Sequence, residues 1–185
     1  MLIINMELYK KGKRGLVYKE GNVIIKVERE DIQAVNRIKN ESDWLKKLNK
    51  FGIGPKHIKF VKNKLYMEFI EGEIIMEYVK NASKKDLKKV LVELLEQCRK
   101  MDILKVTKFE MHKPLKHVIV RKGKPVMIDF ERCKLNENPK NVTQVCQFLS
   151  RFFEIEGIME KAKVYKKTYS DEDFMEIKKC LINTL

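Results

Sequence analysis

The order of the predicted secondary structure changes partway along the chain, and this change limits the folds that the chain can adopt. Residues 7–28 predict two β-prone strands around a turn at 20–22. Residues 56–70 predict a second hairpin, which turns at 62–64. Between the hairpins, apolar residues at helical spacing predict a helix, and these are Ile32, Val35, Ile38, Leu45 and Leu48. The first part of the chain is therefore expected to be rich in strands.

The later part of the chain has mainly helical patterns. A long apolar stripe predicts a helix over about 84–101, with Ser83 as its N-cap and Asp86 three residues further on. A second stripe predicts a helix over about 141–156, and Ser170 with the acidic residues after it opens a last helix. This half is therefore expected to be a group of packed helices.

One late hairpin interrupts the helices, with strands at 117–120 and 125–128. The whole order predicts an α+β fold of two lobes. We expect a strand-rich N-terminal lobe over residues 1–70 and a helical C-terminal lobe over residues 71–185. Gly72 would break the chain between them.

Charge and length restrict the partners. Among 185 residues, 40 are Lys or Arg and 26 are Asp or Glu, which gives a net charge of +14. Such a balance favours anionic partners, namely a nucleotide, RNA or an acidic protein, although a lysine-rich solvated surface explains it equally well. No apolar run approaches the roughly 20 residues that span a bilayer, so we expect a cytoplasmic protein without membrane association.

The cysteines at positions 98, 133, 146 and 180 form no C-x-x-C pair and match no zinc spacing. We therefore expect reduced thiols that are mostly buried.

A glycine turn is the first segment with the chemistry of a binding site. Gly12 and Gly15 flank two basic residues, Val17 follows, and Lys26 lies on the predicted return strand. Glycines let the backbone approach phosphate groups closely, and a lysine on the return strand can contact the phosphates as a point charge. An ordinary hairpin with a surface lysine is the alternative.

Two carboxylates and one strand complete the candidate site. Glu41 on the first predicted helix can orient Lys26, or it is simply a solvated helix residue. Asp129 follows an apolar strand and can bind Mg²⁺, or it is an ordinary turn residue. The strand 65–70 can offer backbone hydrogen bonds to an adenine, or it is a plain edge strand.

The order of these features resembles the protein-kinase-like superfamily. Three stretches carry the resemblance, G-L-V-Y-K-E-G-N-V-I-I-K, Y-M-E-F-I-E-G and K-H-V-I-V-R-K-G-K-P-V-M-I-D-F-E-R, and it covers roughly residues 8–150. The compact members are the most similar, namely RIO-type atypical kinases and the small kinase of the tRNA threonylcarbamoyl-modifying complex.

The resemblance implies a bilobal fold that binds ATP and Mg²⁺. It implies that Gly12, Gly15 and Val17 form the turn that covers the nucleotide. It implies that Lys26 contacts the phosphates and pairs with Glu41. Three residues would contact the adenine as a hinge, Met67, Glu68 and Phe69, and Asp129 would bind the metal ion.

The catalytic loop departs from this family. Its members have approximately H-G-D-x-x-x-x-N before the strand, whereas here His112 occupies the position of the base aspartate and His117 that of the metal-binding asparagine. Glu110 is the nearest carboxylate. Either Glu110 or His112 acts as the base, or neither acts and the protein binds nucleotide without efficient transfer. A zinc site at His112 and His117 is a further alternative.

Three functions follow from these observations. The first is an atypical serine/threonine protein kinase, or an ATPase, that uses ATP and Mg²⁺ on an unidentified protein substrate or on water. The second is a pseudokinase, a nucleotide-binding scaffold in an RNA-linked or ribosome-linked complex. The third is a basic RNA-binding protein without nucleotide, although the chain has no RNA-binding motif and its aromatic residues are not interleaved with basic ones.

Overall fold

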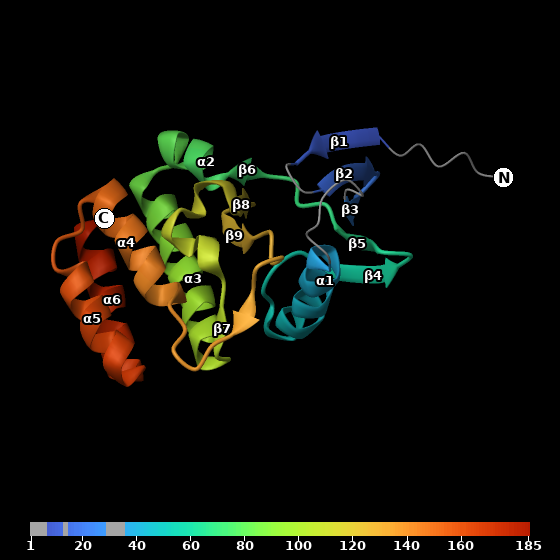
Figure 1. Cartoon of the computed structure of the whole chain (residues 1–185). Helices are drawn as coiled ribbons and strands as arrows, with labels where there is room; N and C mark the ends of the chain where they lie inside the picture. Colours follow the sequence, from blue (N-terminus) through green and yellow to red (C-terminus); the bar gives the residue numbers. More distant parts are fainter. Residues whose placement is uncertain (1–6, 13–14, 29–35) are drawn as a thin grey trace. The chain divides into compact units, whose positions relative to one another are not determined.

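The computed structural model of the protein describes residues 7–12, 15–28 and 36–185, shown in Figure 1. Contacts divide the chain into two compact units. Residues 1–71 together with 128–132 form the first, and residues 72–127 together with 133–185 form the second. The short segment around Asp129 thus packs with the strand-rich part of the chain, although it follows the predicted late hairpin in sequence.

An antiparallel sheet of five strands forms most of the first unit, in the order β1-β2-β3-β5-β4. The strands are β1 (Glu7–Lys11), β2 (Gly15–Glu20), β3 (Val23–Glu28), β4 (His57–Val61) and β5 (Lys64–Glu68). The prediction of two strands over 7–28 was wrong, because β1 also forms. Every residue of β1 is exposed, since it is an edge strand, and so it lacks the alternation that predicts a half-buried strand.

Helix α1 (Arg37–Leu48) packs against β3, β4 and β5 of the same unit (Figure 1). Its buried face includes Ile38, Leu45 and Leu48, which the sequence pattern predicted. The two earlier residues of that pattern, Ile32 and Val35, lie outside the described residues. The helix passes through a 3₁₀ turn into Gly52 and Gly54, which both have positive φ, of 72° and 82°.

Helices dominate the second unit. They are α2 (Ile75–Asn81), α3 (Lys84–Ile103), α4 (Asn141–Phe153), α5 (Ile158–Thr168) and α6 (Asp171–Thr184). In Figure 1, α3 lies next to α4, and α5 packs against both α4 and α6. The predicted N-cap of α3 is confirmed, because the Ser83 hydroxyl accepts a hydrogen bond from the Asp86 N–H. Ser170, predicted to open the last helix, caps α6 in the same way by accepting from the Asp173 N–H.

One helix boundary and two helices differ from the prediction. The helix expected over 141–156 ends at Phe153, since Glu154 adopts φ of 49°. The sequence analysis did not predict α5, whose buried residues Ile158, Ala162 and Tyr165 lie among lysines. It also did not predict the short helix α2. Both helices depend on burial within the unit more than on a strong local pattern.

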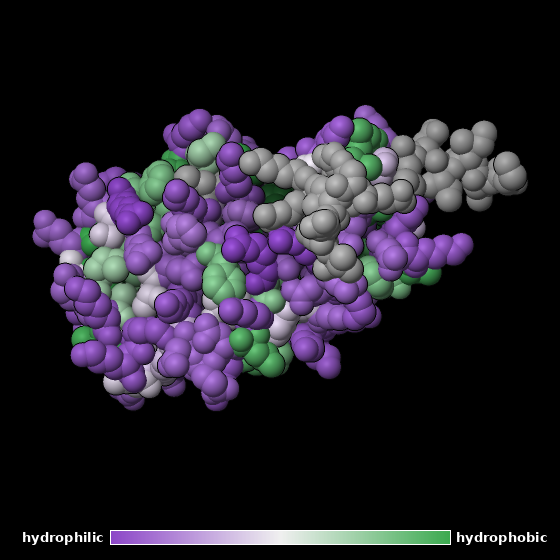
Figure 2. All heavy atoms as spheres, in the orientation of Figure 1, coloured by the Kyte–Doolittle hydropathy of each residue, from purple (hydrophilic) through white to green (hydrophobic). Residues whose placement is uncertain are grey.

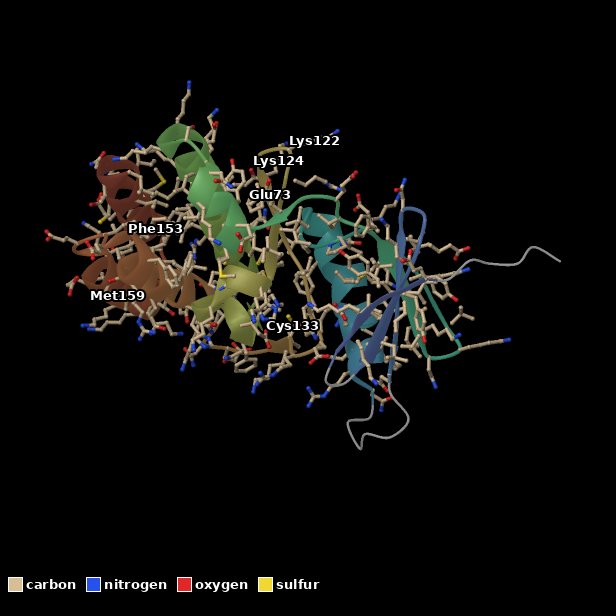
Figure 3. The ribbon with its side chains drawn as sticks, turned by 90° about the horizontal axis from the view of Figure 1, so that it is seen from above. Glu73, Lys122, Lys124, Cys133, Phe153 and Met159 are labelled. Carbon is tan, nitrogen blue, oxygen red and sulfur yellow. The ribbon has the colours of Figure 1, made fainter. Side chains whose placement is uncertain are left out.

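The late hairpin is present as β8 (Val118–Arg121) and β9 (Lys124–Met127), with β6 (Glu73–Ile74) alongside β8. Figure 3 shows Lys122 and Lys124 at the hairpin turn, where Lys122 and Gly123 have positive φ. A second small sheet pairs β7 (Val106–Thr107) with β10 (Lys134–Leu135). Two 3₁₀ turns, Phe109–His112 and Pro114–Lys116, lie between β7 and β8.

Hydrophilic side chains cover most of the face in Figure 2, with small separate hydrophobic areas, as the lysine-rich composition predicts. No helix in the described part of the chain is long and apolar enough to cross a membrane. Cys98, Cys133 and Cys146 are buried and Cys180 is half-buried, which confirms the expectation that the cysteines are mostly buried.

Candidate functional site

Lys26 and Glu41 form the centre of the candidate site in the first unit. Lys26 lies on β3, where it pairs with Val17 of β2 and Leu65 of β5, so its backbone is fixed on both sides. Its Nζ donates to both carboxylate oxygens of Glu41 on α1, at 2.7 and 2.8 Å. The Lys26 side chain is 17% exposed and that of Glu41 only 1%. The ion pair that the resemblance implies is therefore present, while its part in nucleotide binding stays a prediction.

Nearby carboxylates control the charge of Lys26. Burial by itself lowers the pKa of the Lys26 ammonium, but the adjacent Glu41 carboxylate raises it. Asp129 and Glu131 raise it further, and the pKa ends above its ordinary value. Lys26 therefore stays positively charged at neutral pH, as a phosphate-binding lysine must.

Asp129 lies in the same unit, within electrostatic range of Lys26. Its backbone has φ of 67°, a left-handed conformation that residues other than glycine adopt rarely. The next residue, Phe130, donates its N–H to Glu41 Oε1 at 3.1 Å. Glu41 therefore holds both the lysine and the backbone that follows Asp129, and backbone strain of this kind is concentrated at functional sites.

Helix α1 fixes the segment 129–131 through further contacts that the sequence analysis missed. Asn40 Nδ2 donates to the Glu131 carbonyl oxygen at 2.8 Å, and an Arg37 guanidinium nitrogen lies 3.3 Å from the Glu131 carboxylate. Arg37, Asn40 and Glu41 recur at the spacing of one helical face. That spacing was a usable signal, but nothing in the sequence indicates which partner the face contacts.

A hydrophobic socket holds the Phe130 ring, which is fully buried. A side chain on Gly54 would place its Cβ 2.9 Å from Leu45 Cδ2 and 2.9 Å from Phe130 Cε2. Gly54 therefore leaves room for the ring beneath α1. No sequence pattern indicated this role of Gly54.

The glycine turn connects β1 and β2. The Gly12 N–H donates to the Gly15 carbonyl oxygen at 2.9 Å, and a Cβ on Gly15 would lie 2.9 Å from the Val27 carbonyl oxygen. Only glycine fits at Gly15 without displacing the neighbouring strand. The two basic residues between the glycines lie outside the described residues. Val17 lies on β2 directly opposite Lys26.

The predicted adenine hinge, Met67 to Phe69, ends β5. Met67 is buried, the Glu68 N–H donates to the Lys56 carbonyl oxygen at 2.9 Å, and the Phe69 N–H donates to the Asn22 carbonyl oxygen at 2.8 Å. These two donors are used inside the unit. The role of Met67, Glu68 and Phe69 as an adenine hinge stays a prediction.

The residue types around Asp129 suit a metal that arrives with a phosphate ligand. In the described ranges, no group of three or more His, Cys, Asp or Glu side chains is arranged to hold a metal ion alone. Mg²⁺ in phosphoryl-transfer proteins is typically bound by one or two carboxylates together with phosphates and waters. Asp129 fits that pattern, whereas it does not suit a metal held only by protein ligands.

The loop residues expected to act in catalysis lie in the second unit. Glu110 and His112 share the 3₁₀ turn Phe109–His112, and His117 follows the next turn. The Glu110 side chain is 15% exposed, and its Oε2 lies 3.5 Å from Lys108 Nζ. His112 is exposed, with Nδ1 3.1 Å from the Phe109 carbonyl oxygen. The His117 N–H donates to the Pro114 carbonyl oxygen at 2.8 Å.

A buried network anchors the start of this loop. Asp102 accepts from the backbone N–H groups of Asn141 and Val142, at 3.0 and 3.2 Å, and from the Tyr165 hydroxyl at 3.1 Å. Asn141 Oδ1 accepts from the Lys108 N–H at 2.8 Å. Burial raises the pKa of Asp102, although these hydrogen bonds oppose the rise. The network fixes the first turn of α4 and the segment before Glu110, and no sequence pattern predicted it.

Comparison with known proteins shows the family of the chain. A 31% identical relative over 116 residues is an uncharacterized protein of Methanocaldococcus jannaschii, and the match covers 55% of this chain and 99% of that protein. A crystal structure of monomeric WbdD has a TM-score of 0.67 at 15% identity, over 91% of this chain and 44% of that one. A co-crystal structure of WbdD with a kinase inhibitor has a TM-score of 0.65 at 14% identity, over 94% and 44%.

The WbdD structures show similarity of fold alone, and the chain spans less than half of their length. A third structure, described as the bifunctional kinase-methyltransferase WbdD, has a TM-score of 0.64. They fit the bilobal α+β fold that the sequence predicted. A family model described as the RIO domain matches residues 4–167, which is most of the chain. The chain therefore belongs to the RIO domain family of atypical protein-kinase-like proteins.

Proposed function

We propose that the protein is an atypical serine/threonine kinase that binds Mg·ATP and transfers the γ-phosphoryl group to a protein hydroxyl or to water. The observation that carries the proposal is the linkage of Lys26, Glu41 and the segment 129–131 within one compact unit. Glu41 orients the lysine and also accepts a hydrogen bond from the residue next to Asp129. This arrangement supports the proposal, because phosphoryl transfer uses a lysine oriented by a carboxylate and a further carboxylate that holds Mg²⁺.

Each residue has a role in the proposal. A lysine ammonium has three donors, and Lys26 directs two of them to Glu41, so the third is the donor for a phosphate oxygen. Asp129 would hold the Mg²⁺ that neutralises the phosphates when the nucleotide is bound. The turn with Gly12 and Gly15 would cover the phosphates, and the carbonyl oxygens at Glu68 and Phe69 would contact the adenine.

Transfer to a hydroxyl also requires a group that accepts its proton. Histidines at positions 112 and 117, where relatives are expected to have aspartate and asparagine, favour the pseudokinase as the second candidate. A pseudokinase would use the same nucleotide residues without transfer. The net charge of +14 suits an acidic protein or a ribonucleoprotein as partner in either case.

Thermal unfolding with and without Mg·ATP tests the nucleotide part. We expect a ligand at a hundredfold excess over its Kd to stabilise the protein by about 2.7 kcal/mol. Lys26→Ala and Asp129→Asn should each remove this stabilisation, whereas Lys59→Ala, an exposed lysine on β4 of the same sheet, should retain it. A wild-type protein that Mg·ATP does not stabilise would overturn the proposal.

An assay with labelled ATP separates the kinase from the pseudokinase. It measures transfer of the label to the protein itself, to a general protein substrate, and to water. Label transfer or hydrolysis that Asp129→Asn abolishes supports the kinase. Binding without either reaction supports the pseudokinase. RNA binding that weakens steeply with salt, in a protein that ATP does not stabilise, would instead support an RNA-binding protein.

A further inference from the structure

A cavity in the first unit has a lining separate from Lys26, Glu41 and Asp129. Its volume is about 540 Å³, which falls within the range of small-molecule pockets, about 300–1,000 Å³. The end of α1, the turn that follows it, the start of β4 and the end of β5 bound the cavity, and α1 packs against both strands (Figure 1). All of the lining residues belong to the first unit, and only Glu68 of the predicted hinge is shared with the candidate site.

The Asn49 side chain holds the wall of this cavity in place. Its Nδ2 donates to the carbonyl oxygens of Ile53 and Pro55, both at 3.0 Å, and its Oδ1 accepts from the His57 N–H at 2.6 Å. The two glycines of the turn have positive φ, which lets the backbone follow this tight path. The cavity is therefore formed before a ligand arrives, and a ligand does not have to order its wall.

Two ammonium groups make the cavity electropositive. Lys46 and Lys56 both line it and are exposed, and neither ammonium forms an ion pair or a hydrogen bond with a residue that the structure describes. Lys39 on the same helix is different, because it pairs with Asp43. Glu68 supplies the carboxylate of the lining, and its Oε2 accepts from the Lys56 N–H at 3.1 Å. The lining therefore has two positive charges and one negative charge.

His57 adds a neutral hydrogen-bonding group to the lining. Its Nε2 lies 2.9 Å from the Ser42 hydroxyl oxygen. Burial lowers the pKa of the His57 imidazole, and the charge of Lys46 lowers it further. The ring is therefore neutral at pH 7, and its response to Lys46 indicates that this ammonium acts on the wall of the cavity.

We propose that the cavity binds a small phosphorylated molecule, about the size of a sugar phosphate, with its phosphate group on Lys46 and Lys56. Ammonium groups bind phosphate oxygens through charge-assisted hydrogen bonds. The lining contains no hydrophobic residue, so the rest of the ligand is expected to be polar. The Glu68 carboxylate disfavours a long polyanion such as RNA, because it repels a further phosphate.

Isothermal titration calorimetry with ribose 5-phosphate, inorganic phosphate and ribose tests this site. We expect the wild type to bind ribose 5-phosphate saturably, to bind inorganic phosphate at least about 3-fold more weakly, and not to bind ribose. Replacing both lysines, as Lys46→Gln with Lys56→Gln, should weaken the binding of ribose 5-phosphate by about 10-fold or more, because both phosphate contacts are removed.

The matched control removes two nearby lysines that do not line the cavity. Lys47 of α1 lies over the Trp44 ring, and Lys59 of β4 lies over the Tyr66 ring. Lys47→Gln with Lys59→Gln makes the same change in net charge as the tested pair. This control should keep the Kd for ribose 5-phosphate within about 2-fold of the wild-type value.

Three results would overturn the inference. The first is a wild type that does not bind ribose 5-phosphate saturably. The second is an equal loss of affinity in the two double variants, because binding would then follow net charge alone. The third is ribose binding as tightly as ribose 5-phosphate, because the phosphate would then contribute nothing. A protein that fails to bind Mg·ATP overturns the kinase proposal and leaves this inference standing, since Lys26, Glu41 and Asp129 do not line the cavity.

Discussion

Glu41 and Asp102 are both buried carboxylates that collect several hydrogen bonds, and one lies in each unit. Glu41 is held in the first unit between the Lys26 ammonium and the Phe130 N–H. Asp102 in the second unit accepts from neutral donors, which come from Asn141, Val142 and Tyr165. The same side-chain chemistry therefore serves two different purposes.

The hydrogen-bond partners of the two carboxylates explain why Glu41 and Asp102 serve different purposes. The donors around Asp102 belong to the start of α4 and to α5, so they hold these helices to α3. The main partner of Glu41 is a cation that is 17% exposed and has a third donor. A carboxylate that orients a partly exposed cation suits a binding site, whereas one that collects backbone N–H groups suits a structural anchor.

Replacing Asp102 should have the largest effect on stability. Asp102→Ala leaves several buried donors without an acceptor, and each costs about 1–3 kcal/mol, so we expect a loss of at least about 3 kcal/mol in the free energy of unfolding. Urea unfolding measures it. Asp43→Ala is the matched control, because Asp43 pairs with Lys39 on the exposed face of α1 and should contribute about 0.5 kcal/mol or less. Equal losses would mean that Asp102 is not an anchor.

The Lys26–Glu41 pair should respond differently. Lys26→Met leaves a buried carboxylate without its cation, and we expect a loss of about 2 kcal/mol, moderated because Lys26 is partly exposed. Adding Glu41→Gln removes that charge while an amide oxygen still accepts from the Phe130 N–H. The double variant should therefore recover about 1 kcal/mol in urea unfolding and still fail to bind Mg·ATP.

Recovery of stability without recovery of binding would show that the pair is kept for its ligand. If the double variant were instead less stable than Lys26→Met alone, Glu41 would be a structural anchor like Asp102, and the contrast between the two carboxylates would fail.

The contrast also explains what could be predicted from the sequence. Lys26, Glu41 and Asp129 were identifiable because their chemistry and order along the chain are local signals, and the strand-then-helix order predicted the α+β fold. The Asp102 network was not identifiable, because its members come from α3, α4 and α5 and meet only through packing. The burial of Lys108 could not be predicted for the same reason, since most lysines in a lysine-rich chain are exposed to solvent.

Gly54 offers a sharper test of how the segment 129–131 is held. Gly54→Ala is strained by φ of 82° and also places a Cβ 2.9 Å from the Phe130 ring. Gly52→Ala is the matched control, since it has φ of 72° with nothing within 4 Å of the added carbon. We expect urea unfolding to show a loss of about 1 kcal/mol for the control and about 2 kcal/mol for Gly54→Ala. Equal losses in the free energy of unfolding would mean that the space around the Phe130 ring can take the added carbon without a clash.

The smallest expected effect is a pH dependence at the contact between Ser42 of α1 and His57 of β4. The Ser42 hydroxyl lies 2.9 Å from His57 Nε2, and burial, followed by the charge of Lys46, lowers the pKa of His57 below its ordinary value. The unfolded chain therefore binds this proton more tightly than the folded protein does. The contribution of His57 to stability is complete above the unfolded-state pKa of about 6.5 and is lost as the pH falls below it.

Asp102 has the opposite sign, because its pKa is raised by burial and protonation at low pH favours the folded state. Urea unfolding at pH 7.5 and 5.5 brackets the His57 titration. We expect the wild type to lose more stability over this interval than His57→Gln. If His57→Gln lost as much stability as the wild type, the proton would be bound elsewhere, and the burial of His57 would not be what disfavours it.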